Sequence, residues 1–135
     1  MAKLSCPHEL LDQMVRHAQR GIPLEICGLV GGRAGRAYRV VEVPNVDSAP
    51  QVRFTMDRRA MVAAILDFDR AGLEVVAIYH SHPATPPQPS PTDIALATWP
   101  DALYLIVNPA FDPPIRAWSI HGGRVEAAEL VAASA

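Results

Sequence analysis

The sequence has few cysteines, little net charge and no long apolar segment, and each shortage excludes a class of protein. Its only cysteines are Cys6 and Cys27, which form no CxxC pair. A disulfide framework is therefore not expected, and both are predicted to be free thiols in a reducing compartment. The formal net charge of -2 provides no basic surface for nucleic acid or for an anionic membrane.

Long hydrophobic runs are also missing. No segment approaches the roughly 20 apolar residues of a membrane span, and the N-terminal stretch carries Glu9, Asp12 and Arg16 where a signal peptide would be apolar. We therefore expect a cytoplasmic protein. Internal repeats and linkers are absent, while 50% of the residues are hydrophobic. This balance predicts one domain over residues 1–135, with its core at 7–130.

Helical and strand-like patterns alternate along the chain. One helix should begin at Pro7 and end at Gly21, a second should follow Asp57 as its N-cap and end at Gly72, and a third should cover 91–98. Strands are expected at 2–5 (an edge strand), 24–32, 37–43, 53–56, 75–79, 103–107, 115–120 and 124–130, followed by a frayed alanine-rich end. These elements predict an α/β fold with a mixed β-sheet and about three flanking helices.

The segment His80-Ser81-His82-Pro83 directly follows the apolar run 75–79, which is predicted to be a buried strand. Side chains alternate along a strand, so His80 and His82 point to the same side and can reach one metal ion. A proline-rich loop then leads to Ser90 and Asp93. Two imidazoles and a carboxylate leave the fourth tetrahedral position open, which is typical of catalytic zinc. The pattern predicts a zinc hydrolase with His80, His82 and Asp93 as ligands.

Ser90 and Asp93 also fit a second interpretation. In Ser90-Pro91-Thr92-Asp93, the serine can be a helix N-cap, the proline the first helical residue and the aspartate the third. The two interpretations are compatible, because a cap fixes a helix whose first turn can hold a ligand. Both are kept.

Glu25 is unusual among the acidic residues because it lies in the apolar, glycine-rich stretch 24–32. A buried, unpaired carboxylate there would cost several kcal/mol or be forced neutral, and a nearby metal cation would remove that conflict. Metal hydrolases also need a group that passes a proton from water to the leaving amine, usually a carboxylate. The alternative is that Glu25 lies at a strand edge and reaches solvent.

Together these residues resemble the JAMM, or MPN+, metalloprotease family. Its pattern is a glutamate upstream of His-(Ser/Thr)-His-Pro, then six residues, Ser, two residues and Asp, and this chain fits it without departure. Glu25 stands in the family's Glu-x-Cys-Gly setting, and the resemblance covers about residues 10–118. It implies the JAB1/MPN, cytidine-deaminase-like architecture.

The resemblance also implies roles for individual residues. One zinc ion per chain would be held by His80, His82 and Asp93, with a catalytic water as the fourth ligand. Glu25 would be the general acid/base. Ser90 would hydrogen-bond the water or the developing oxyanion.

The implied reaction is hydrolysis of an amide or isopeptide bond. Members that cleave ubiquitin carry an insertion after the metal-binding aspartate, whereas this chain passes from Asp93 to a strand near Leu103. It is therefore similar to compact prokaryotic members, some of which process small β-grasp sulfur carriers ending in Gly-Gly. We expect cleavage after the Gly-Gly of such a ubiquitin-like carrier.

The sequence also bears on other functions. A nucleotide deaminase is excluded because its His-x-Glu and Pro-Cys-x-x-Cys signatures are missing. A non-catalytic MPN scaffold and a general zinc peptidase are the remaining alternatives. A homodimer is compatible with the sequence.

Overall fold

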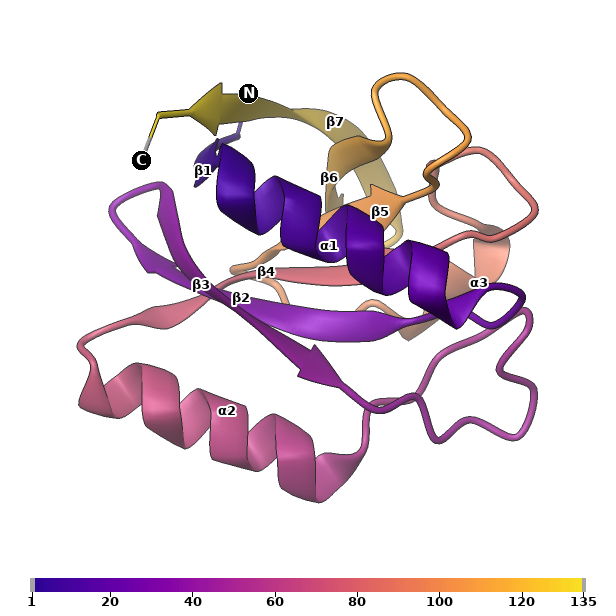
Figure 1. Cartoon of the computed structure of the whole chain (residues 1–135), viewed down its shortest axis with the longest axis horizontal. Helices are drawn as coiled ribbons and strands as arrows, with labels where there is room; N and C mark the ends of the chain where they lie inside the picture. The colour runs from indigo at the N-terminus through magenta and orange to yellow at the C-terminus, as the bar shows by residue number, and fades with distance from the viewer. Residues whose placement is uncertain (1, 135) are drawn as a thin grey trace.

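Within residues 2–134, which the computed structural model describes, seven β-strands form one closed mixed sheet (Figure 1). The strands are β1 (Lys3–Pro7), β2 (Cys27–Arg33), β3 (Arg36–Val43), β4 (Glu74–Ser81), β5 (Leu103–Val107), β6 (Ile115–His121) and β7 (Arg124–Ala133). The helices are α1 (His8–Gly21), α2 (Arg58–Arg70) and α3 (Pro91–Leu96). The strand order is β1-β3-β2-β4-β5-β6-β7, and β7 pairs with β1. The predicted mixed α/β class is confirmed.

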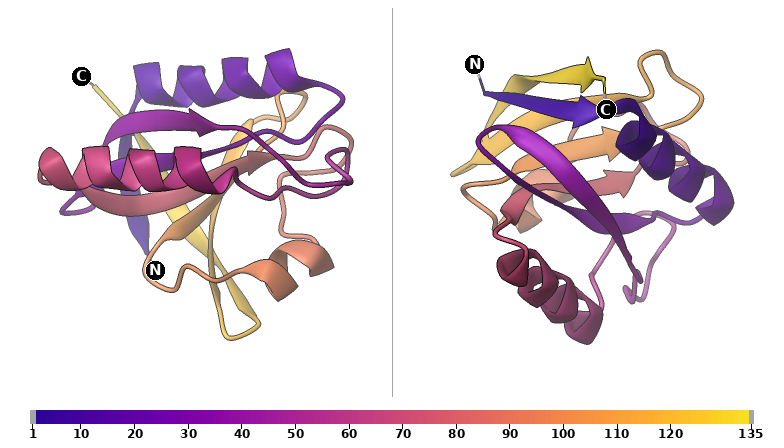
Figure 2. Two further views of the ribbon diagram at one scale, coloured as in Figure 1. Left: turned by 90° about the horizontal axis from the view of Figure 1, so that it is seen from below. Right: turned by 60° about the vertical axis from the view of Figure 1, so that its left-hand side comes forward.

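The two long helices lie on opposite faces of the sheet (Figure 2). Met14 of α1 belongs to the same buried cluster as Tyr79 of β4. Phe68 of α2 belongs to a second cluster with Ile78, the preceding residue of β4. Because neighbouring strand residues point to opposite faces, β4 contributes to both clusters, as its continuous apolar run predicts.

The helices begin and end close to the positions that local sequence signals predict, although α1 begins at His8 and Pro7 is still the last residue of β1. Asp57 caps α2 through a 2.9 Å hydrogen bond from the Ala60 N–H to Asp57 Oδ2, as predicted. Beyond α2, Gly72 adopts a φ of +73°, a conformation that favours glycine. The third helix is shorter than predicted, because Ala97 is already extended.

Two predictions at the chain ends are wrong. Strand β1 does not lie at a sheet edge, because it pairs with both β3 and β7. Strand β7 continues through the alanine-rich end, and its Ala133 pairs with Pro7 of β1. Closure of the sheet supplies β7 with a partner that local composition does not reveal.

Two smaller features also bear on the sequence predictions. The predicted strand at 53–56 is an isolated bridge between Asn45 and Met56. Both Cys6 and Cys27 are buried and free. None of the helices within residues 2–134 is long and apolar enough to cross a membrane.

Three chain segments meet at one end of the sheet. Strands β4 and β5 are parallel, with Ser81 beside Val107, so both end there. Strand β2 is antiparallel to β4, with Cys27 beside His80, and therefore begins at the same end. The residues that follow β4 and β5 and those that precede β2 are thus brought together.

Candidate metal centre and active site

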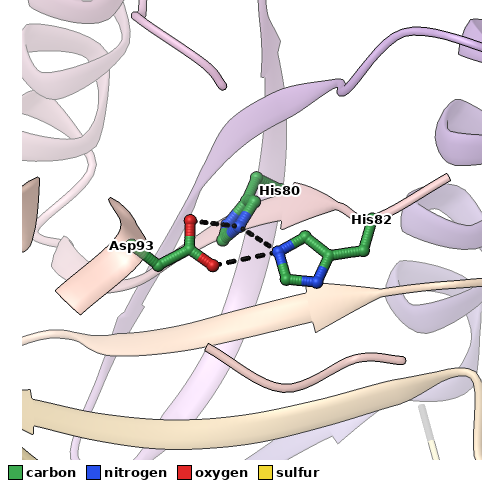
Figure 3. Close-up of side chains that lie close together, drawn as sticks. All are labelled: His80, His82 and Asp93. Carbon is green, nitrogen blue, oxygen red and sulfur yellow. Dashed lines mark hydrogen bonds and ion pairs between the residues drawn. The ribbon is translucent and has the colours of Figure 1, made fainter. Parts of the chain in front are cut away.

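The side chains of His80, His82 and Asp93 converge on one point (Figure 3). The two Nε2 atoms are 3.2 Å apart, Asp93 Oδ2 is 2.9 Å from His82 Nε2, and Asp93 Oδ1 is 3.2 Å from His80 Nε2. One ligand atom from each residue lies within 4.8 Å of the others. Among the described residues this is the one group of three or more such side chains able to hold a metal ion.

The start of α3 places Asp93. Ser90 Oγ accepts a 3.1 Å hydrogen bond from the Asp93 N–H, and Asp93 Oδ2 accepts a 2.9 Å hydrogen bond from the Ser90 N–H. This reciprocal pair is a capping box, with Pro91 at the helix start. The capping interpretation of Ser90 and Asp93 is confirmed, and the cap leaves Asp93 aimed at the two histidines.

Replacing Ser90 with alanine should destabilise this arrangement. Loss of a serine cap typically lowers the free energy of unfolding by about 1 kcal/mol, and the freed Asp93 should bind metal less tightly. Thermal unfolding and metal titration would measure both effects, with Ser90→Thr, which keeps the hydroxyl, as the control. Unchanged stability and metal affinity in Ser90→Ala would contradict the capping role.

The histidine rings are oriented by different contacts. His82 Nδ1 is 2.9 Å from the Pro86 carbonyl oxygen, and because that oxygen can only accept, Nδ1 carries the proton. In the neutral ring that ligates a metal, Nε2 therefore carries the lone pair, which faces Asp93 and His80. The His80 ring is stacked on Phe54, with ring centroids 4.5 Å apart. Its Nδ1 is buried without a hydrogen-bond partner among residues 2–134.

The charge state of this cluster suits a cation. Burial lowers the pKa of His80, which favours the neutral imidazole that ligates metals. Burial opposes ionisation of Asp93, but hydrogen bonds from both histidines outweigh it and hold its pKa well below the ordinary range. Burial alone would lower the pKa of His82, yet Asp93 and the Pro86 carbonyl raise it. The donor set of two imidazoles and an ionised carboxylate therefore fits a divalent metal.

Glu25 lies opposite His82 at the same end of the sheet. The β2–β4 ladder continues to Ile26, whose carbonyl accepts a 3.0 Å hydrogen bond from the Ser81 N–H. Extending this register by one step sets Glu25 level with His82, just outside both strands, and the charge of His82 acts on the Glu25 carboxyl group. Contrary to the sequence-based expectation, Glu25 is not inside the strand, because β2 begins only at Cys27.

The Glu25 carboxyl group is buried and incompletely satisfied. The residue is 6% exposed, which excludes the interpretation as a solvent-reaching residue. Its Oε1 has no hydrogen-bond partner in the described part of the chain. Burial raises the pKa of Glu25 to about 7, and the positive charge of His82 partly offsets this rise. Such an atom is available to exchange a proton near neutral pH.

Asn45 was not singled out from the sequence, yet it organises the chain around Glu25. Its Nδ2 donates to the carbonyls of Glu25 and Arg53, at 2.9 and 3.0 Å, and its Oδ1 accepts from the Thr55 N–H at 3.0 Å. It thereby holds the extended segment 53–56 beside the site. An asparagine in an irregular segment gives no such signal, because these three partners lie eight or more residues away.

Asn108 and Trp118 were also not predicted from the sequence to be site residues. Both donate hydrogen bonds to the loop between His82 and Ser90. Asn108 Nδ2 donates to the Thr85 carbonyl, and Trp118 Nε1 donates to the Pro87 carbonyl. One signal was present for Asn108. It follows a buried strand directly, and a polar residue at that place is expected near the end of a parallel neighbour.

A pocket of about 280 Å³ adjoins the cluster. His80 and Asp93 form part of its wall, and the remaining wall is mostly apolar or aromatic. Its other lining residues are Arg53, Phe54, Thr55, Met56, Met61, Ile78, Thr92, Leu96, Thr98, Trp99 and Tyr104. Any substrate that occupies this pocket lies directly against two of the candidate ligands.

Comparison with known proteins shows the family of this chain. The family described as prokaryotic homologs of the JAB domain matches residues 7–121. A probable TtuB-protein conjugate cleaving protease from Thermus thermophilus is 41% identical over 96 residues, which are 71% of this chain and 64% of that protein. The CysO-cysteine peptidase of Mycobacterium tuberculosis is 37% identical over 102 residues, which are 74% of this chain and 69% of that protein.

A solved structure shares the fold of this chain. A solution structure of a protein from Desulfitobacterium hafniense superposes with a TM-score of 0.86 at 31% identity, and the match covers 98% of this chain and 94% of the other. The similarity therefore extends over nearly the whole chain.

Proposed function

The chain belongs to the family of prokaryotic homologs of the JAB domain, and on that premise we propose that it is a zinc-dependent peptidase acting on small ubiquitin-like carrier proteins. One observation carries the proposal. A metal-ligand set of His80, His82 and Asp93 lies at the same end of the sheet as a buried carboxylate, Glu25, which has an unpartnered oxygen. A metal-dependent hydrolase needs these two components together.

We assign the metal ligands to His80, His82 and Asp93, with zinc as the ion that their nitrogen and oxygen donors suit. When bound, zinc supplies a Lewis acid that polarises the scissile carbonyl and lowers the pKa of water toward about 7. The remaining work falls to the protein. Asp93 stays ionised, and His82 Nδ1 donates its proton in a hydrogen bond to the Pro86 carbonyl. Asp93 and the Nε2 atom of His82 can therefore both present lone pairs to the ion.

Glu25 is assigned the proton transfer. Its unpartnered Oε1 accepts the proton of the attacking water and returns it to the departing amine nitrogen. Burial raises the pKa of Glu25 and so favours uptake of a proton, whereas a bound cation would favour its release. Ser90 Oγ accepts from the Asp93 N–H, and its own hydroxyl proton can still be donated to the oxyanion.

An unpaired main-chain edge offers a place for an extended substrate tail. The segment 53–56 is already paired along one edge, the edge that faces Asn45. There the Thr55 carbonyl accepts a hydrogen bond from the Val46 N–H. Neighbouring residues point their main-chain groups to the opposite edge. Those of Phe54 and Met56 make no hydrogen bond among the described residues. This edge borders the pocket beside His80, and a tail could pair with it as an added strand.

A tail ending in Gly-Gly suits such a site. Residues without side chains let the backbone approach the metal closely, and strand pairing satisfies its main-chain groups. Both curated relatives described above have names that refer to a small carrier, either as a protein conjugate or as an adduct with cysteine. We therefore propose cleavage directly after the Gly-Gly of a β-grasp carrier.

The test uses a β-grasp carrier extended by one residue beyond its Gly-Gly. Incubation with the zinc-loaded enzyme should release that residue and leave a carrier ending in Gly-Gly, as measured by mass spectrometry. A carrier with Ala-Ala in place of Gly-Gly is the matched control and should remain intact. The proposal fails if several extended carriers stay intact while unrelated linear peptides are cut efficiently.

A further inference from the structure

The proline-rich loop between His82 and Ser90 is hydrogen-bonded to side chains of the sheet and its end through two of its carbonyl groups, those of Thr85 and Pro87. Asn108 Nδ2 donates to the Thr85 carbonyl at 2.8 Å, and Trp118 Nε1 donates to the Pro87 carbonyl at 3.0 Å. Between them lies the Pro86 carbonyl, which accepts from His82 Nδ1 at 2.9 Å. Three consecutive carbonyls therefore each accept a hydrogen bond from a side chain.

The loop makes few main-chain hydrogen bonds of its own, although its proline rings restrict the φ angles. Four of its residues between 83 and 89 are prolines, which have no N–H to donate. Among the described residues, its only internal main-chain hydrogen bond runs from the Gln88 N–H to the Pro86 carbonyl, at 2.7 Å. Pro87 is nevertheless fully buried. Side chains that reach the loop from the sheet add the hydrogen bonds that tie its carbonyls to the sheet.

The two donors are themselves held firmly. Asn108 is 4% exposed, its N–H donates to the Pro114 carbonyl at 2.8 Å, and its Oδ1 accepts from the Ala110 N–H at 3.0 Å. Trp118 lies within β6, opposite Tyr104 of β5. Neither donor can follow the loop if it shifts, so each can impose a position on it.

We propose that Asn108 and Trp118 are positioning residues of the metal centre. They fix the carbonyls on either side of Pro86, and the Pro86 carbonyl in turn fixes the ring rotation and the protonated nitrogen of His82. Outer partners of this kind orient a ligating histidine and raise metal affinity. Neither residue touches substrate or metal in this account.

Two substitutions remove one donor each with little change in shape. Trp118→Phe keeps an aromatic ring and loses the N–H. Asn108→Asp keeps the oxygen that accepts from Ala110 and loses the amide donor, and its added negative charge would by itself favour a cation. Each variant should bind zinc about tenfold more weakly. This is the lower end of the effect of outer-shell changes, because each side chain acts on His82 only through the Pro86 carbonyl.

Zinc dissociation constants would be measured by competition with a chromogenic chelator. The visible spectrum of the Co²⁺-substituted protein should also change, since it reports ligand geometry. The matched control is Gln13→Glu, which removes a side-chain amide donor to the Val40 carbonyl, a 3.3 Å hydrogen bond between α1 and β3. Thermal unfolding of the metal-free proteins would show whether the three variants lose comparable stability.

The inference rests on the proposed metal site, but the outcomes separate the two. Weaker zinc binding and altered Co²⁺ spectra in Trp118→Phe and Asn108→Asp, with parental values in Gln13→Glu, support the positioning role. Parental zinc affinity and spectra in both Trp118→Phe and Asn108→Asp would overturn the positioning role while leaving the metal site intact. A parent protein that binds no zinc would overturn the metal site and this inference together.

Discussion

Glu25→Gln should leave zinc bound while turnover of an extended carrier falls by about 10²–10⁴-fold, the usual contribution of general acid–base catalysis. Glutamine matches glutamate in size and polarity but cannot accept the proton of the attacking water. Zinc content and the catalytic constant would be measured on the same preparation. Glu126→Gln, at an exposed position of β7, is the control and should behave as the parent. Parental turnover in Glu25→Gln would assign Glu25 a purely structural role.

The same substitution has a second readout in the metal-free protein. Burial raises the pKa of Glu25 from 4.5 to about 7, so between these pH values the folded state holds a proton that the unfolded chain has released. Glu25 should therefore contribute a fall in the free energy of unfolding as the pH rises through this interval, on the order of 3 kcal/mol. Glu25→Gln should abolish that fall. A pH dependence unchanged by the substitution would contradict the buried, proton-holding state of Glu25.

The double substitution His80→Ala/His82→Ala should abolish zinc binding and activity together. Two of the three candidate ligands are lost, and Asp93 alone cannot hold the ion in competition with water. Elemental analysis would give the zinc content per chain, and circular dichroism would verify that the fold persists.

His121→Ala is a suitable comparison for this experiment, because His121 is exposed at the end of β6 and lies outside the cluster. It should retain full zinc content and turnover. A double variant that keeps one zinc ion per chain would show that the ligands lie elsewhere and would end the assignment of His80 and His82.

The local sequence determined the features that depend on short spacing. The i, i+2 histidines at the end of an apolar strand were expected to share a face, and their Nε2 atoms indeed lie 3.2 Å apart. Ser90 and Asp93 were expected to form a helix cap, and they form a capping box. In each case the interacting residues are three or fewer positions apart, so backbone periodicity alone brings them together.

The tertiary structure decided the features that depend on distant partners. Glu25 was singled out as a misplaced charge, but only the β2–β4 register, which joins residues more than fifty positions apart, places it opposite His82. The fastening of the proline-rich loop by Asn108 and Trp118 likewise joins residues 23 and 31 positions apart. The closed sheet depends on pairing β1 with β7, at opposite ends of the chain. Such contacts arise when apolar faces pack together, and no local pattern specifies which strands become neighbours.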